Sequence, residues 1–353
     1  MTWPVCANDG PQALHPRLGR DGSYSLWSPR FKEGFHSADG ALGEARRVFV
    51  APAQLERFAP GDPLTVVEVA VGTGTNTATL IEAVNRRGLE LRWWGLEMDA
   101  APLGLALADG RFQAQWSPAV VRRLVELGRS DRMRWGDARA RLPELTERLE
   151  GRCDLVLLDA FSPRRCPELW SLEFLRQLAR LLAPSGRLLT YSSAAAVRRA
   201  LELAGLKLAA IPLPNLNSRG LDARASPGDS PSPSNAGGSR WSAGTVASPG
   251  DIPTDISTAI PTMAPLRPLT LMEREHMGST AGEPYRDPSG TATAAQMLAA
   301  RARAQASSGA ESSSAWQRRW GIARRQPSRS EGRSIQAPQN DDQYSTRCHE
   351  GRC

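Results

Sequence analysis

A glycine-rich turn beside an acidic residue is the first feature of this sequence with the makings of a chemical site. Glu68 stands in the apolar run 66–70, which leads directly into VGTGTN at 71–76. Glycines at such a turn let the backbone approach a ligand where a Cβ would clash, and the amides that open the next helix face that ligand. We therefore predict that Glu68, Gly72, Gly74 and Asn76 contact a cofactor.

Two further acidic residues follow the next two apolar runs. Glu97 ends the run 91–97, and Asp137 follows the short run 133–135. A carboxylate after the second strand of such a fold can accept hydrogen bonds from both hydroxyls of a ribose. Asp137 is then placed to accept a hydrogen bond from the amino group of an adenine. Acids at three successive strands indicate a cofactor that contains a nucleoside.

Two cofactors with an adenosine fit this pattern, S-adenosylmethionine and a nicotinamide dinucleotide. A dinucleotide site needs a third glycine three residues after Gly74, where this chain has Thr77. Glu68 beside the turn would repel a pyrophosphate, whereas it helps to organise a cationic ligand. The sequence therefore favours S-adenosylmethionine.

Asp159 is the candidate catalytic residue, because it ends the next apolar run, 153–159. The end of the fourth strand in this fold faces the sulfonium of the cofactor, so groups there touch the methyl acceptor. An amine must be neutral to attack, and a carboxylate can orient it and take up its proton. We place Phe161, Pro163 and Trp170 on the substrate side, with the aromatic rings stacking a base. The alternative is a helix-capping Asp159 with aromatic residues that only pack.

The elements that position these residues alternate along residues 64–212. Expected strands are 64–70, 91–96, 133–135, 153–159, 186–192 and 206–211, with helices near 76–87, 118–127, 140–149, 171–182 and 194–204. A short β-branched segment at 244–248 predicts a last edge strand. Strands that alternate with helices predict an α/β fold with a mostly parallel sheet. We expect seven strands in the Rossmann-like arrangement of class I methyltransferases.

Composition divides the 353 residues into five segments. We predict an N-terminal segment at 1–60 that packs on the core, and the Rossmann-like core at 61–213. A Pro/Ser/Gly-rich insertion at 214–243 cannot bury enough surface to order, so we expect disorder there. The last strand and a helical segment, with a helix near 290–306, occupy 244–320. A disordered tail is expected at 321–353.

Charge and cysteine content limit the compartment and the partners. The chain has 44 Lys+Arg against 37 Asp+Glu, a balance that suits a phosphate-bearing partner. We expect phosphate contacts at Arg164, Arg165, Arg198 and Arg199. The five cysteines are irregularly spaced, so we expect neither a disulfide framework nor a metal site. The sequence has no apolar run of 18 residues, so we expect no membrane span. A cytoplasmic protein is expected; its oligomeric state is not indicated.

Several longer motifs resemble one known family. DLVLLDAFSP at 154–163 and PELW at 167–170 are similar to the fourth-strand signature of the methyltransferase domain of the tRNA 5-methylaminomethyl-2-thiouridine biosynthesis protein. GRLLTYSSAAAVRRAL at 186–201, DGSYSLWSP at 21–29, FHS at 35–37 and Glu44 resemble the same family. The blocks GTVAS at 244–248, PYRDP at 284–288 and WQRRW at 316–320 look like the single-domain, cyanobacterial form, which lacks the flavin (FAD) oxidase domain.

The resemblance implies methyl transfer from S-adenosylmethionine to the exocyclic amine of 5-aminomethyl-2-thiouridine at the wobble position of tRNA. It places Glu68, Gly72, Gly74, Glu97 and Asp137 on the cofactor and Asp159 at the acceptor amine. One departure is Ala70, where the family often has glycine. The alternatives are a small-molecule amine methyltransferase and a catalytically degenerate RNA-binding module.

Overall fold

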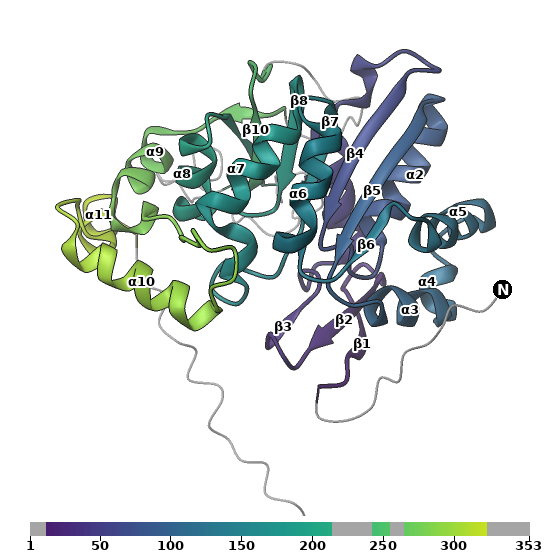
Figure 1. Cartoon of the computed structure of the whole chain (residues 1–353), viewed down its shortest axis with the longest axis horizontal. Coiled ribbons are helices and arrows are strands. Elements are labelled where there is room, and N and C mark those ends of the chain that lie inside the picture. Colours follow the sequence, from purple (N-terminus) through teal and green to yellow (C-terminus); the bar gives the residue numbers. More distant parts are fainter. Residues whose placement is uncertain (1–11, 214–241, 255–264, 323–353) are drawn as a thin grey trace, which may run out of the picture.

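An eight-stranded sheet forms the centre of the protein (Figure 1). The structure is a computed structural model and describes residues 12–213, 242–254 and 265–322. The strands are β4 (Pro63–Val69), β5 (Glu90–Glu97), β6 (Met133–Trp135), β7 (Cys153–Leu158), β8 (Leu182–Thr190), β9 (Lys207–Pro212), β10 (Ser242–Ser248) and β11 (Arg267–Pro268). Their order across the sheet is β11-β9-β10-β8-β7-β4-β5-β6. Strands β4 to β8 pair in parallel, so the predicted mostly parallel sheet is confirmed.

Helices cover both faces of this sheet (Figure 1). They are α2 (Thr75–Arg87), α3 (Ala101–Ala108), α4 (Gly110–Gln113), α5 (Pro118–Arg129), α6 (Ala138–Leu149), α7 (Leu172–Leu181) and α8 (Ala195–Leu203). Leu155 and Leu157 of β7 belong to one core with α2 and α5, while Val156 and Leu158 belong to a second core with α6, α7 and α8. Side chains of a strand alternate between faces, and burial of both faces explains the continuous apolar run of β7.

The strand expected at the edge of the sheet lies inside it. Residues 244–248 are part of β10, which pairs antiparallel with β8 on one side and β9 on the other. Val246 and Ala247 of β10 are fully buried, as an interior strand requires. The two-residue strand β11 occupies the edge instead and brings the sheet to eight strands. Residues 242–243, predicted in the insertion, belong to β10; the rest of that insertion and residues 323–353 lie outside the described part.

The N-terminal segment forms a small sheet of its own at the lower end of the large one (Figure 1). β1 (His15–Leu18), β2 (Tyr24–Ser28) and β3 (Glu33–Gly34) pair antiparallel and precede α1 (Ala41–Glu44) and the π-helical turn η1 (Ala45–Val50). The hydroxyl of Ser23 accepts a hydrogen bond from the amide of Ala41 at 2.7 Å, and η1 packs on α2. The contact between η1 and α2 joins the N-terminal segment to the core.

The C-terminal helices lie beside α7 and α8, away from β1–β3 (Figure 1). They are α9 (Leu271–Gly278), the short 3-10 helix η7 (Thr280–Gly282), α10 (Ala294–Ser307) and α11 (Ser313–Arg319), and α10 confirms the helix predicted near 290–306. The fully buried Trp316 stacks on His276 with ring centroids 3.9 Å apart, which holds α11 on α9. Within the described residues, no helix has the length and apolar character that a membrane crossing requires.

Candidate active site

The glycine-rich turn between β4 and α2 lies at the carboxyl edge of the sheet, and its residues are buried. Gly72 and Gly74 have φ of +58° and +79°, a left-handed conformation that glycine adopts without strain. A Cβ added to Gly74 would lie 2.9 Å from Leu103 Cδ1, and one added to Gly72 would lie 3.1 Å from Phe35 Cδ1. The missing Cβ at each position therefore leaves room for a neighbouring side chain of the protein, which packs directly against the turn.

Ala70 stands just before this turn with φ of +62°, although it carries a Cβ. A left-handed backbone costs a non-glycine residue about 1–2 kcal/mol. Ala70→Gly should therefore raise the free energy of unfolding by about 0.5–1 kcal/mol, because the added freedom of the unfolded chain offsets part of the gain. Chemical denaturation of both proteins measures this. A destabilised variant would show that the Ala70 methyl makes packing contacts worth more than the backbone strain.

Glu97 connects the end of β5 to the glycine-rich turn. Its Oε2 accepts a hydrogen bond from the amide of Gly72 at 2.8 Å, and its Oε1 accepts one from the amide of Asp99 at 3.1 Å. Burial raises the pKa of this carboxyl, while hydrogen bonds from the backbone of Gly72, Asp99 and Met98 lower it. Each oxygen keeps a further lone pair, so the carboxylate can still accept hydrogen bonds from ribose hydroxyls, as predicted.

Glu97→Ala should weaken S-adenosylmethionine binding by about 1–3 kcal/mol, because charge-assisted hydrogen bonds to ribose are lost. Glu90→Ala, at the exposed opposite end of β5, is the matched control and should bind normally. Titration calorimetry measures both affinities, and thermal melting checks that the Glu97 variant is folded. Equal affinities for the two variants would remove Glu97 from the cofactor site.

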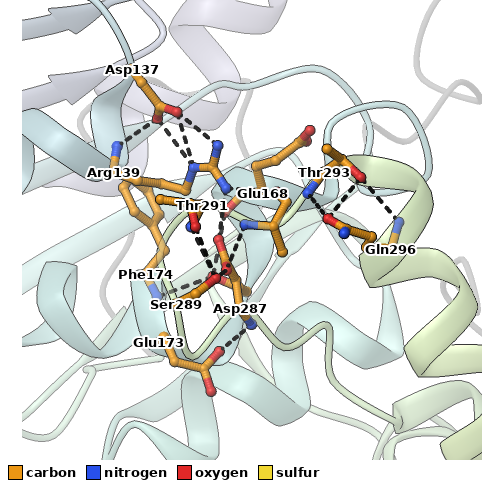
Figure 2. A network of polar contacts seen from close by, with 12 residues as sticks. Asp137, Arg139, Glu168, Glu173, Phe174, Asp287, Ser289, Thr291, Thr293 and Gln296 are labelled. Carbon is orange, nitrogen blue, oxygen red and sulfur yellow. Dashed lines mark hydrogen bonds and ion pairs between the residues drawn. The ribbon is translucent and has the colours of Figure 1, made fainter.

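Asp137 caps the start of α6 and is held by its own helix (Figure 2). One carboxylate oxygen accepts from the amide of Arg139 at 2.9 Å, and the Arg139 guanidinium pairs with the carboxylate at 2.7 Å. The same guanidinium pairs with the buried Asp287 at 2.7 Å. Asp137 keeps about a third of its side chain exposed, so an adenine amino group remains a candidate donor to it.

The PYRDP motif at 284–288 thus has a structural explanation in this network (Figure 2). Asp287 accepts from Arg139, and Glu173 accepts from the amide of Asp287 at 2.8 Å and from Arg286 at 2.6 Å. The carbonyl of Tyr285 accepts from the amide of Leu172 at 2.9 Å. The motif therefore fixes the C-terminal segment to the start of α7 and to the residue that orients Asp137.

Glu68 does not reach the surface of the turn. The residue is fully buried, and its Oε2 accepts from Thr77 Oγ1 at 2.6 Å and from Trp93 Nε1 at 2.9 Å. Desolvation raises the pKa of Glu68 to about 7, against the lowering effect of these hydrogen bonds. The predicted direct contact with the cofactor is therefore wrong: Glu68 holds α2 to β5 beneath the turn. Thr77, which stands where a dinucleotide site has glycine, is committed to this buried contact.

Asp159 lies just beyond β7, next to the glycine-rich turn. Its amide donates to the carbonyl of Val69 at 3.2 Å, and its Oδ2 accepts from Asn76 Nδ2 at 2.7 Å. Asn76 is 3% exposed, and its Oδ1 has no hydrogen-bond partner among the described residues. Asn76, predicted as a cofactor contact, therefore orients the carboxylate of Asp159.

The surroundings of Asp159 increase its affinity for a proton. Desolvation and the negative charges of Glu44 and Glu68 raise its pKa well above the usual range, and the hydrogen bond from Asn76 opposes this. Tyr191 donates its hydroxyl to the carbonyl of Ala160 at 2.9 Å, next to Asp159 in the chain. A carboxylate with a raised pKa is a stronger proton acceptor than an ordinary aspartate.

The residues predicted to contact substrate divide into an accessible one and two buried ones. Phe161 is half-buried and follows Asp159 by two residues. Trp170, in the short helix η4 (Pro167–Trp170), is fully buried and donates its Nε1 to the carbonyl of Phe161 at 2.8 Å. The predicted stacking of Trp170 on a base is therefore wrong, because its ring packs in the core and supports the loop. Pro163 is also buried, so it shapes this loop.

Among the arginines expected on phosphates, Arg198 is the exception. It is 2% exposed and pairs with Glu273 at 3.0 Å, and it also donates to Thr245 and Ser242. The predicted phosphate contact of Arg198 is therefore wrong, because its charge is used inside the protein. Arg164 and Arg165 are exposed, and the partly exposed Arg199 pairs with Glu202.

Sequence reasoning missed the aromatic residues that the N-terminal segment brings to this site. The ring of Phe31 stacks on Phe161, and Phe35 meets Phe161 edge-on with centroids 5.0 Å apart. Phe35 belongs to a motif noted for its family resemblance, but its contact with Phe161 depends on tertiary structure. The sequence signal for Phe31 is its place between Arg30 and Lys32, an aromatic residue flanked by two cations.

Comparisons with known proteins agree with this geometry. Residues 116–223 match the family model of S-adenosyl-L-methionine-dependent methyltransferases. The chain is 33% identical over 216 residues to the tRNA 5-methylaminomethyl-2-thiouridine biosynthesis bifunctional protein MnmC of Pseudomonas aeruginosa, covering 56% of this chain and 33% of that protein. The MnmC of Azoarcus sp. is 33% identical over 205 residues, covering 53% and 32%. The crystal structure of MNMC2 from Aquifex aeolicus has a TM-score of 0.60 at 22% identity, covering 88% of this chain and 86% of that one.

The family match and the fold point to one class: residues 116–223 match S-adenosyl-L-methionine-dependent methyltransferases, and the mostly parallel sheet flanked by helices is the Rossmann-like fold expected of that class. The chain's resemblance to the methyltransferase part of the tRNA 5-methylaminomethyl-2-thiouridine biosynthesis proteins is likewise confirmed. The chain matches about a third of the length of these curated relatives.

Proposed function

We propose that this methyltransferase acts on the exocyclic amine of 5-aminomethyl-2-thiouridine at the wobble position of tRNA. The observation that carries the proposal is the pairing of Asp159 with Asn76 beside the glycine-rich turn, with Oδ2 of Asp159 fixed at 2.7 Å. The names of the related proteins supply the substrate. Because tRNA is the proposed substrate, we also propose that the protein works in the cytoplasm.

The cofactor side of the site is built from three places in the sheet. The turn at Gly72 and Gly74 would lie against the methionine part, Glu97 would hold the ribose, and Asp137 would accept from the adenine amino group. S-adenosylmethionine, when bound, supplies a methyl group that its positive sulfonium activates. Glu68 supports this side from below through Thr77.

On the acceptor side, Asp159 has two tasks. It accepts a hydrogen bond from the acceptor amine and thereby orients the nitrogen lone pair, and it takes up the proton that the amine loses. Asn76 leaves Oδ1 of Asp159 free for the amine by occupying Oδ2. The buried surroundings that raise the pKa of Asp159 make it a suitable proton acceptor.

The proposal is tested by offering the protein two kinds of acceptor. The purified protein is incubated with labelled S-adenosylmethionine and either tRNA that carries 5-aminomethyl-2-thiouridine or free alkylamines. We expect label in the tRNA and little in the amines. Label in the amines alone would identify a small-molecule amine methyltransferase, and cofactor and tRNA binding without label would identify an inactive RNA-binding module.

A further inference from the structure

The turn between β2 and β3, residues 29–32, lies directly against the loop 159–163 that follows β7. The rings of Phe31 and Phe161 stack with centroids 4.2 Å apart and planes inclined by 19°. At this spacing there is no room for a third ring between them. Phe31 therefore covers the face of Phe161, two residues from Asp159, on which an aromatic ligand would stack.

Phe31 sits in an unusual place for an apolar ring. It is half-buried at the tip of a turn, between the exposed residues Arg30 and Lys32. The guanidinium of Arg30 lies over the Phe31 ring, 5.2 Å from its centroid. An aromatic ring between cations is suited to a nucleotide, because the ring stacks on the base and the cations meet the phosphates.

A second contact holds the turn in its present position. Glu33 Oε2 accepts from Ser162 Oγ at 2.8 Å and from the Ser162 amide at 3.2 Å. The ring stack of the turn and these hydrogen bonds of β3 are both contacts between the β2–β3 hairpin and the loop 159–163. All four residues are half-buried, so neither contact lies in the hydrophobic core.

We propose that residues 29–32 form a base-binding platform, and that the flipped-out acceptor base enters between Phe31 and Phe161. Arg30 and Lys32 then contact the phosphates on either side of that nucleotide. This inference rests on the proposed function, because it takes an RNA base as the acceptor. An enzyme that acts on a base must take it out of its stack, and a pair of phenyl rings offers a new stack in exchange.

Phe31 variants test the stacking. Methylation is measured on an anticodon stem–loop RNA and on the free nucleoside, both carrying 5-aminomethyl-2-thiouridine. Phe31→Ala should lower kcat/KM about tenfold or more on both substrates, since base–aromatic stacking is lost. Phe31→Tyr should restore the rate, and Phe31→Leu, which keeps apolar packing without a ring, should not. S-adenosylmethionine affinity and the melting temperature should match those of the wild-type protein in all three variants.

Variants of the two cations separate phosphate contacts from stacking. Arg30→Ala and Lys32→Ala should each weaken stem–loop binding and lower the slope of log K against log[salt] by about 0.7, the value for one contact with a single strand. Neither should affect the free nucleoside, which has no phosphate. Arg176→Ala, an exposed cation on α7, is the control and should leave the slope unchanged.

The results of these experiments separate a failure of the base-binding platform from a failure of the proposed function. If the wild-type protein methylates the stem–loop and Phe31→Ala does so at a comparable rate, the platform is wrong and the proposed function stands. A loss that Phe31→Leu repairs as well as Phe31→Tyr would also overturn the platform, because packing alone would explain it. If the wild-type protein methylates neither substrate, the proposed function fails and the platform falls with it.

Discussion

Asp159→Asn should lower the rate of methyl transfer by about 10²–10⁴, the range for a positioned general base, while S-adenosylmethionine still binds. The amide keeps the shape of the carboxylate but cannot take up the proton of the acceptor amine. Single-turnover kinetics on tRNA measure the rate, and calorimetry measures the cofactor affinity. Unchanged turnover would leave Asp159 with a structural role, and a parallel loss of cofactor affinity would make it a cofactor ligand.

The pH dependence gives an independent check on the same residue. Burial, Glu44 and Glu68 raise the pKa of Asp159, so protons occupy it at low pH and leave as the pH rises. The acceptor amine also becomes reactive only when it loses its proton. The rate of the wild-type protein should therefore rise with pH through two ionisations, whereas Asp159→Asn should retain only that of the amine. Identical profiles would show that Asp159 does not titrate in the reaction.

Arg198→Ala should destabilise the protein by about 3 kcal/mol, the lower end of the range for breaking a buried ion pair. Arg198 donates to Thr245, Ser242 and the carbonyl of Gly244 besides Glu273, and all of these partners are buried. Arg267 also pairs with Glu273, at 2.6 Å, and its charge should limit the loss in the variant. The free energy of unfolding is measured by chemical denaturation.

Arg199→Ala is the matched control for this variant. The two arginines are neighbours on α8, but Arg199 pairs with Glu202 at the surface, and its loss should change stability by less than about 0.5 kcal/mol. If Arg198→Ala were as stable as Arg199→Ala, the buried network would not hold α8 to β10 and α9. This buried network explains why Arg198, unlike its neighbour Arg199, is not available for a phosphate contact.

The central strands were predictable because their sequence pattern depends on burial alone. Strands β4, β5 and β7 read as apolar runs since both of their faces are covered by helices. The position of β10 was not predictable in this way. β10 pairs with β8 and β9 through hydrogen bonds between segments far apart in the chain. A short β-branched segment has the same sequence pattern at the edge of a sheet as in its interior, so the pattern does not indicate these neighbours.

The sequence placed the site residues at the correct strands, but it did not predict how deeply each side chain is buried. Glu68 lies two residues after Val66, and side chains two apart on a strand share a face. Val66 is fully buried on the side of α2, so this period of two was the available signal that Glu68 is buried as well. Glu97 and Asp159 lie at or beyond the last residues of their strands, where the sheet edge opens to a ligand.

The aromatic side of the site needed the tertiary structure. Phe31 and Phe161 are far apart in the chain and meet only because β1–β3 fold back against the carboxyl edge of the sheet. The burial of Trp170 depends on the packing of η4 against α7 and α10. Neither contact produces a periodic pattern in the local sequence. The prediction that Trp170 contacts substrate therefore rested on its residue type alone.

The identity of the nucleoside that the protein makes is the most direct test of the proposed methyl transfer to tRNA. The purified protein and S-adenosylmethionine are incubated with tRNA that carries 5-aminomethyl-2-thiouridine, and the digested nucleosides are analysed by mass spectrometry. We expect this nucleoside to be replaced by one that is heavier by one methylene group, with the new methyl on the exocyclic nitrogen, and we expect Asp159→Asn to leave the starting nucleoside in place. Unaltered wobble nucleosides in the presence of active, cofactor-bound protein would contradict this proposal.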